Sequence, residues 1–165
     1  MPAVKTRILG IDPGIAITGY AVVEYTKSSY DEDFDLITSG SIQTDKSLKS
    51  PCRLLEIHND LEFLLEKYTP DVAAVEKIFY FKNAKTIMPV SEARGVITMT
   101  LRKFNLPIFD YTPLEIKQTI TGFGRAEKCD VKQMVEIILS DCNLSKLDDT
   151  IDAVAIAICH ARMNI

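Results

Sequence analysis

The sequence predicts an α/β fold with a five-stranded mixed sheet and helices on both of its faces. Three observations predict this class. Short segments of apolar and β-branched residues fill most of the first 45 positions, apolar residues then recur with the 3.6-residue period of helices, and two further short apolar segments lie between the helical stretches. With 165 residues, 47% of them apolar, the chain can form one sizeable core, so we expect a single domain spanning 1–165.

The first three strands are expected to form an antiparallel meander. The turn Pro13-Gly14 separates the first strand from the second, and the polar, acidic segment 27–33 separates the second from the third. Connections this short join antiparallel neighbours, because parallel strands need a longer crossover. The three strands are predicted at 7–12, 17–24 and 34–44.

Helices and strands alternate through the rest of the chain. Pro89 fits best in the first turn of a helix, where its missing backbone donor is not needed, so the second helix is expected to begin near Thr86. The segment 72–75 is apolar throughout and predicts a strand that is buried on both faces. The other elements are predicted as a helix from Ser50-Pro51 to just before Pro70, the second helix to about Phe104, a strand at 106–109, a short helix after Pro113, a helix from about Glu127 and a last helix from about Asp148.

Charge is distributed unevenly along the chain, whose formal net charge is -4. Residues 1–76 carry 7 basic and 13 acidic side chains, residues 77–132 carry 10 and 5, and residues 133–165 carry 2 and 5. A basic middle between acidic ends is what catalytic carboxylates facing a polyanion would produce, although a solvated basic surface gives the same distribution. The net charge therefore does not exclude a nucleic-acid partner.

Cysteine spacing and hydropathy indicate a soluble protein of the cytoplasm. The longest uncharged run, 13–23, is too short to cross a bilayer, and no signal peptide precedes the first strand. The cysteines show no C-x-x-C spacing, so we expect reduced, buried thiols in a reducing compartment. They are Cys52, Cys129, Cys142 and Cys159.

Two carboxylates stand at the ends of apolar strands. Asp12 ends the first strand, and Glu76 follows the strand at 72–75. If these strands are parallel neighbours, both side chains emerge at one edge of the sheet, which is where open α/β sheets bind ligands. Taken singly, Asp12 could equally accept hydrogen bonds within the Pro13-Gly14 turn, and Glu76 could be a solvated strand end.

Two more carboxylates, Asp149 and Asp152, have the i, i+3 spacing that places side chains on one face of a helix. The apolar residues after Asp152 indicate that this helix enters the core directly after its acids. A helix dipole favours acidic residues in the first turn, which would explain one of these aspartates, or Asp148, without any catalytic role. It does not explain a second acid on the apolar face.

Together the four carboxylates predict a site for hard cations. No matching group of His or Cys accompanies Asp12, Glu76, Asp149 and Asp152, and oxygen ligands of this kind suit Mg²⁺. We expect two Mg²⁺ ions in each site, with Mn²⁺ as a substitute. Two ions held by shared carboxylates can activate water and stabilise the leaving oxygen of a phosphodiester, which needs no covalent nucleophile from the protein.

Two groups of aromatic and basic residues are candidates for nucleic-acid contacts. The segment after Glu76 interleaves aromatic residues with lysines, as binding surfaces for unpaired bases do, although Phe79 and Phe81 could instead pack in the core. The second group surrounds Gly122-Phe123-Gly124, where glycine would let the backbone approach a phosphate, and a solvated helix face is the alternative for its cations. The candidates are Phe79, Tyr80, Phe81, Lys82, Lys85, Lys117, Arg125 and Lys128.

These motifs resemble those of one family, the RuvC resolvases, and they occur in the same order. The matching segments are G-I-D-P-G at 10–14, T-G-Y at 18–20, V-E-K-I-F at 75–79, A-R-G at 93–95, K-Q-T-I-T-G-F-G at 117–124, A-E-K at 126–128 and D-T-I-D-A-V-A-I-A at 149–157. The resemblance covers nearly the whole chain. The set is far more specific than any one of its motifs.

The resemblance implies an RNase H-like fold and a Mg²⁺-dependent crossover junction endonuclease. It implies that the four acids ligate metal, that Phe79 inserts near the junction, and that Lys117 and Lys128 lie close to the cut. The enzyme would be a homodimer that nicks two opposed strands of a four-way (Holliday) DNA junction in recombination and repair, working with a branch-migrating helicase. The sequence departs from the family pattern at Lys77, the acidic loop 31–35 and Pro89. These departures leave the cleavage sequence preference and the dimer surface open.

Two other functions fit parts of the sequence. G-I-D-P-G followed by T-G-Y-A-V also resembles the phosphate loop of actin-like phosphotransferases and ATPases, but those enzymes need two lobes and 165 residues provide one. The non-enzymatic alternative is a junction-binding protein that has lost cleavage. The complete set of acids argues against it, because a buried carboxylate without a function destabilises the fold.

Overall fold

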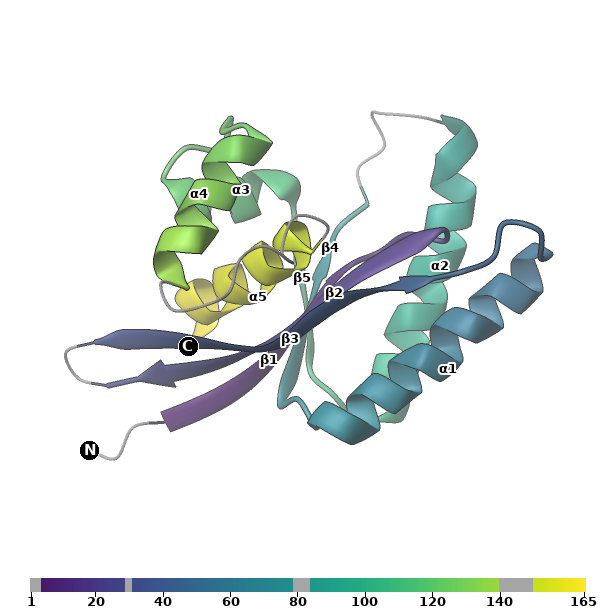
Figure 1. Ribbon diagram of the computed structural model, residues 1–165, viewed down its shortest axis with the longest axis horizontal. Coiled ribbons are helices and arrows are strands. Elements are labelled where there is room, and N and C mark those ends of the chain that lie inside the picture. The colour runs from purple at the N-terminus through teal and green to yellow at the C-terminus, as the bar shows by residue number, and fades with distance from the viewer. Residues whose placement is uncertain (1–3, 29–30, 79–83, 140–149) are drawn as a thin grey trace.

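The computed structural model describes residues 4–28, 31–78, 84–139 and 150–165 (Figure 1). Within these ranges, five strands form one sheet and five helices pack on its two faces. The strands are β1 (Val4–Asp12), β2 (Ile17–Lys27), β3 (Glu32–Gln43), β4 (Val72–Glu76) and β5 (Ile108–Tyr111). The helices are α1 (Ser50–Tyr68), α2 (Ala84–Lys103), α3 (Pro113–Thr121), α4 (Lys128–Ile138) and α5 (Ile151–Asn164).

The sheet combines an antiparallel half with a parallel half, in the order β3-β2-β1-β4-β5. β1 pairs antiparallel with β2, and β2 with β3, which confirms the predicted meander. β4 pairs parallel with both β1 and β5. The carboxyl ends of β1, β4 and β5 therefore lie at one edge of the sheet, as the interpretation of the strand-end acids requires.

The helices form a layer on each face of the sheet. Figure 1 shows α1 and α2 on one side, and α3, α4 and α5 on the other. Because side chains alternate along a strand, β1 contributes to both layers: Ile8 packs in the core on the α5 side, and Leu9 packs in the core on the α1 and α2 side. β4 lies between two strands and under both layers, which is why its first four residues are buried, as predicted.

Helix α5 is packed unusually close to the sheet. Ten of its residues are buried, and small side chains face β1. A Cβ atom at Gly10 would lie 2.1 Å from the carbonyl oxygen of Ala153 and 2.9 Å from the backbone nitrogen of Ala157. Only glycine fits there, so this residue lets the backbone of α5 contact the backbone of β1.

Several predicted boundaries are wrong. α2 begins at Ala84, so Pro89 lies inside the helix rather than in its first turn, at the cost of one backbone hydrogen bond. β5 begins at Ile108, two residues later than predicted. α5 begins at Ile151 with Thr150 as its N-cap, three residues later than predicted. The helical i, i+3 argument therefore does not place Asp149, which lies outside the described residues.

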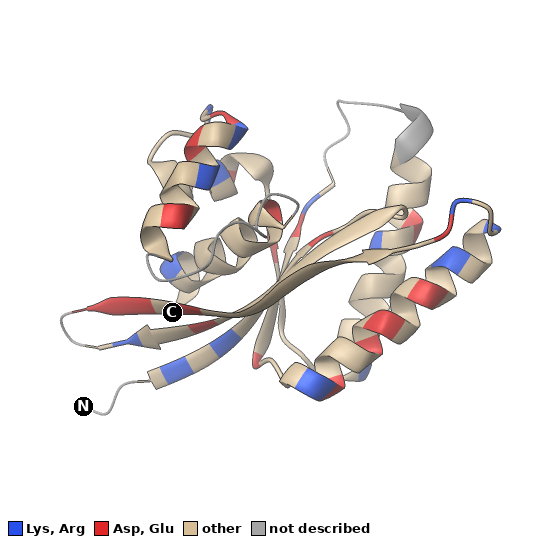
Figure 2. Cartoon of the chain, viewed as in Figure 1, with Lys and Arg blue, Asp and Glu red and all other residues tan. Residues whose placement is uncertain are grey.

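The surface carries most of the charge. Figure 2 shows acidic residues along α1 and at the tip of the β2 and β3 hairpin, while both signs occur on α3 and α4.

Cys52 and Cys129 are exposed and only Cys159 is buried among the described cysteines, so the prediction of buried thiols is wrong for two of them. Across the described ranges, no helix has the length and apolar character that spanning a bilayer requires.

Candidate active site

The parallel pairing of β1 with β4 brings Asp12 and Glu76 together. Ile11 is the register partner of Val75, so the next residue on each strand is an acid at the same edge of the sheet. The two side chains are joined by a hydrogen bond. On the other side of β1, Asp12 is opposite Gly19, which leaves space beside the carboxylate. The expectation that these two acids share a location is confirmed.

A third carboxylate, Asp152, reaches the same place from the first turn of α5. Its position depends on the close contact between α5 and β1. The carbonyl oxygen of Ala153, the next residue, lies so near Gly10 that it would clash with a side chain there. Lys128, the first residue of α4, donates to Asp152 Oδ2 at 3.0 Å. The pair is exposed, with 85% of the lysine side chain accessible to solvent, so it contributes no more than about 1 kcal/mol to stability.

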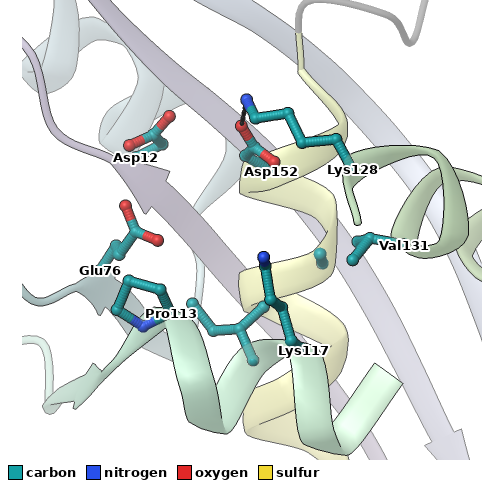
Figure 3. Close-up of a pocket in the computed structure, with 9 residues that line it drawn as sticks. Asp12, Glu76, Pro113, Lys117, Lys128, Val131 and Asp152 are labelled. Atoms are coloured by element: carbon teal, nitrogen blue, oxygen red, sulfur yellow. Dashed lines mark hydrogen bonds and ion pairs between the residues drawn. The ribbon is translucent and has the colours of Figure 1, made fainter. Parts of the chain in front are cut away.

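These residues surround a pocket of about 380 Å³ between the strand ends and the helices. Figure 3 shows the carboxylates of Asp12, Glu76 and Asp152 and the ammonium groups of Lys117 and Lys128 directed into it. The acids come from β1, β4 and α5, and the lysines come from α3 and α4. The pocket is lined by Asp12, Glu76, Pro113, Ile116, Lys117, Lys128, Val131, Asp152 and Ala155.

The two acids on the strands are partly buried, and this changes how they ionise. Burial is the main cause that raises the pKa of Glu76 to about 8, and the nearby carboxylates of Asp12 and Asp152 add to it. Burial also raises the pKa of Asp12 above its usual range, and the charge of Asp152 is the second cause. The pocket therefore disfavours the charged forms of Glu76 and Asp12.

Lys117 and Lys128 compensate only in part for the negative charge of the carboxylates in the pocket. The hydrogen bond to Asp152 raises the pKa of Lys128, so this ammonium group is charged throughout the physiological range. Lys117 points into the pocket and forms no ion pair with any residue that the structure describes. In this arrangement, Asp152 is paired with a lysine, whereas Asp12 and Glu76 lie in surroundings that disfavour their charged forms. Within the described ranges, no three acidic, histidine or cysteine side chains surround one point closely enough to hold a metal ion.

Some of the predicted site residues lie elsewhere or outside the described part of the chain. Asp149, Phe79, Tyr80, Phe81 and Lys82 lie outside the described residues, and the side chain of Lys85 does as well. Arg125 is exposed in the connection between α3 and α4 and does not line the pocket. The predicted residues that the structure does bring together are Asp12, Glu76, Asp152, Lys117 and Lys128.

Sequence reasoning missed the residues that fix the position of Asp152. Gly10 was noticed as part of a motif, but its contact with α5 was not predicted. The signal was present, because glycine inside an apolar strand weakens that strand and marks a close approach of another backbone. Ala153 and Ala157 have the i, i+4 spacing that gives one helix face a row of small side chains, which complements that glycine.

The chain matches one family along almost its whole length. The model of the family described as "Crossover junction endodeoxyribonuclease RuvC" matches residues 8–160. A protein of that description from Caldicellulosiruptor saccharolyticus is 47% identical over 154 residues, which cover 93% of this chain and 91% of the relative.

Solved structures of similar proteins have the same fold. The structure of Thermus thermophilus RuvC is 28% identical, has a TM-score of 0.85, and covers 94% of this chain and 93% of its own. T. thermophilus RuvC in complex with a Holliday junction substrate is 29% identical, has a TM-score of 0.84 and covers the same shares of the two chains. The RNase H-like fold expected from the sequence is therefore confirmed.

Proposed function

This chain belongs to the RuvC family of crossover junction endodeoxyribonucleases, and we propose that it cuts four-way DNA junctions by hydrolysing one phosphodiester bond in each of two opposed strands. Relatives of the same description match it over more than nine tenths of both chains. A solved structure that this chain resembles holds a Holliday junction as substrate. These findings favour the nuclease over the phosphotransferase and over a junction-binding protein without activity.

One observation carries the proposal for the site: three carboxylates from separate parts of the sequence meet in a single open pocket together with two lysines. Asp12 and Glu76 come from neighbouring strand ends, and Asp152 comes from a helix that a glycine contact holds against the sheet. A fold gains no stability from bringing like charges together. The arrangement is therefore best explained by a cationic ligand and a phosphate substrate.

The residues fit Mg²⁺, which is the proposed metal, with two ions in each site and Mn²⁺ as a substitute. All donor atoms are carboxylate oxygens, which hard cations prefer. Burial, and then the neighbouring carboxylates, raise the pKa of Glu76 to about 8, so the pocket without a bound cation disfavours the charged form of this acid. Asp12, Glu76 and Asp152 would hold the metal, with Asp149 as the proposed fourth ligand.

Bound metal would activate water and stabilise the leaving oxygen of the phosphodiester. The residues of the chain have complementary tasks. Asp12 and Glu76 supply negative charge on the strand side of the pocket. Lys117, whose ammonium group points into the pocket, stabilises charge that develops on the phosphate oxygens. Lys128 donates to Asp152 and keeps this carboxylate directed toward the pocket.

The partners of the enzyme are also proposals. A junction has two equivalent strands to cut, and paired nicks need two sites related by a two-fold axis, so we propose a C2 homodimer. Helix α2 is the proposed contact, and it carries the exposed apolar side chains Met88 and Met99. A branch-migrating helicase is the proposed further partner, in the cytoplasm. Sedimentation at working concentration tests the dimer, and a monomer that still cuts both strands in concert would contradict it.

A cleavage assay tests the function directly. A synthetic four-way junction and a linear duplex of the same arm sequence are incubated with the protein and Mg²⁺, with EDTA as the control. We expect symmetric nicks in two opposed strands of the junction, and no cleavage of the duplex or in EDTA. Equal cleavage of both DNAs, or tight ATP binding without cleavage, would contradict the proposal.

A further inference from the structure

An exposed aromatic side chain, Phe123, lies between two helices that both contribute residues to the acidic pocket. It lies in the connection between α3 and α4, and 61% of the residue is exposed. Lys117 precedes this connection and Lys128 follows it, and both line the pocket. In Figure 1 the connection lies at the same end of the molecule as the carboxyl end of β4. The ring is therefore exposed to solvent in a connection whose two flanking helices line the pocket.

The connection is held rigidly, although it buries little of its own surface. Gln118, on the last turn of α3, contacts both glycines: its Nε2 donates to Gly122 O at 2.7 Å, and its Oε1 accepts from Gly124 N at 2.9 Å. Gly122 has φ of 78°, a left-handed conformation that glycine adopts without strain. Thr121 Oγ1 accepts from the amide of Phe123 at 3.1 Å. The backbone at Phe123 is thus held in place by hydrogen bonds to Thr121 and Gln118.

The hydrogen bonds within the connection exclude one expected role for it. Glycines in this segment suggested a backbone that approaches a phosphate. However, the amides of Gly122, Phe123 and Gly124 all donate within the protein, to the backbone or side chain of Gln118 and to Thr121. The amide of Ala126 also donates internally, to Phe123 O at 3.0 Å. These four amides are occupied, so the connection contributes side chains to a ligand and not a cradle of backbone donors.

The charges around the ring suit a nucleic acid. Lys117 and Arg125, on either side of the connection, form no ion pair with another residue in the described part of the chain. The nearby acids are engaged in caps: Glu115 accepts from the amide of Thr112, and Asp130 accepts from the amide of Glu127. An exposed ring with a cation on each side of it in the sequence is a combination typical of surfaces that bind the bases and phosphates of opened strands.

We propose that Phe123 is a DNA-contacting residue whose ring packs on a base of the junction strand beside the cut. The inference rests on the proposed function and adds a second aromatic contact on the α3 and α4 side of the pocket. DNA is the occupant that the flanking cations and the location between two pocket-lining helices favour. The contact is apolar, so it adds affinity without adding to the electrostatic attraction.

A binding measurement with a matched control tests the contact. Fluorescence anisotropy of a labelled four-way junction in EDTA measures binding without cleavage. Phe123→Ala should weaken binding by about 5- to 100-fold. The slope of log Kd against log salt should not change, because no phosphate contact is lost. Phe63→Ala removes a ring that is also 61% exposed but lies on α1, across the sheet, and should bind like the wild type.

A second variant reports the contact spectroscopically. The chain contains no tryptophan, so Phe123→Trp introduces a single indole. Stacking on a base should quench its emission when the junction is added and should protect it from acrylamide. Phe63→Trp should show neither change. Phe123→Trp should also retain junction affinity, because tryptophan offers a larger stacking face.

The possible results distinguish failure of the Phe123 contact from failure of the proposed junction-cleaving function. Loss of affinity in Phe123→Ala together with quenching in Phe123→Trp supports the contact. Unchanged affinity in Phe123→Ala overturns it, as does tryptophan emission that is the same with and without DNA. If the wild-type protein binds the junction no better than a linear duplex, the proposed function has failed, and the contact fails with it.

Discussion

The acids at the amino ends of the parallel strands β1 and β4 have very different surroundings from the acids at their carboxyl ends. At the amino end, acids are matched by cations and amides: Arg7 donates its backbone N–H to Asp71 Oδ2 at 2.8 Å and its guanidinium to Glu24 Oε2 at 3.1 Å. At the carboxyl end, Asp12 and Glu76 face each other, and burial raises the pKa of both carboxyl groups. The acids near the amino end of this strand pair thus have cationic or amide partners, whereas the two acids at its carboxyl end face each other.

The difference appears in how the acids ionise. Hydrogen bonds from Lys5 and Arg7 lower the pKa of Glu24, whereas burial raises the pKa of Glu76 to about 8. A lowered pKa means that the folded protein stabilises the carboxylate, and a raised one means that the fold tolerates it poorly. The acids at the amino end therefore stabilise the folded protein in their charged form. The acids at the carboxyl end would need a cation that the protein's own side chains do not supply.

Amide substitutions at the two edges should give the largest contrast. Asp12→Asn and Glu76→Gln each remove a proposed metal ligand, so junction cleavage should fall by on the order of 10³-fold, about 4 kcal/mol of transition-state stabilisation. Junction binding in EDTA should hold or improve, because a negative charge near phosphates is removed. Gel assays of cleavage and anisotropy measure the two effects. Cleavage by Asp12→Asn at near wild-type rate would rule out the proposed metal site.

Asp71→Asn is the control from the amino edge. It keeps an oxygen that can accept from the Arg7 backbone but removes the charge, so stability should fall by about 1 kcal/mol or less. Cleavage should be unchanged. If Asp71→Asn reduced cleavage as much as Asp12→Asn, the functional contrast between the edges would be lost.

Stability without metal should depend on pH in opposite directions at the two edges. The pKa of Glu76 is raised, so its contribution is fully present below pH 4.5 and is lost as pH rises through about 8. The pKa of Glu24 is lowered, so its contribution is present above pH 4.5 and is lost as pH falls through the lowered value. Thermal unfolding in EDTA should show a decrease in Tm between pH 6 and pH 9 that Glu76→Gln reduces. A decrease of the same size in both proteins would contradict this assignment.

Mg²⁺ should restore that lost stability. An ion that binds only the folded state adds about 2.7 kcal/mol at 100 times its Kd. The increase in Tm should be larger at pH 9 than at pH 6, because at the lower pH the ion must displace the proton of Glu76. Scanning calorimetry with and without Mg²⁺ measures it. An equal increase in the Glu76→Gln variant would exclude this acid as a ligand.

The lysines should have the smallest effects on the fold. Lys117→Ala and Lys128→Ala should each change stability by less than about 1 kcal/mol, because the Lys128 pair with Asp152 is exposed and Lys117 has no ion-pair partner among the described residues. Each should reduce the magnitude of the log-log salt slope of junction binding by about one unit. A changed cleavage sequence preference with an unaltered slope would show that they contact bases instead.

The strands and the meeting of Asp12 with Glu76 followed from the sequence because they depend on local patterns. Apolar runs marked β1 and β4, and two acids directly after parallel strands necessarily share an edge. The start of α5 did not follow, because acidic residues before Ile151 look like a helical first turn. The exposure of Cys52 and Cys129 was also missed, since it depends on which helix face points to solvent.

Other features of the site depend on contacts between distant segments. The raised pKa of Asp12 and of Glu76 requires both burial and proximity, which no single stretch of sequence encodes. Likewise, Lys117 and Lys128 were identified as cations, but only the packing of α3 and α4 against α5 directs them into one pocket. The packing of α5 on Gly10 combines residues 143 to 147 positions apart along the chain. Patterns within a segment predict helices and strands, whereas the packing between distant segments is seen only in the structure.

The position of α5 has a consequence for biosynthesis. Asp12 and Glu76 leave the ribosome early, but Asp152 belongs to a helix that is synthesised more than seventy residues after Glu76. Until that helix docks on Gly10, one wall of the pocket is missing and the sheet face beneath it is uncovered. A nascent chain that does not yet include α5 therefore cannot assemble the acidic pocket, and a potentially damaging nuclease becomes competent only once this helix has closed the core.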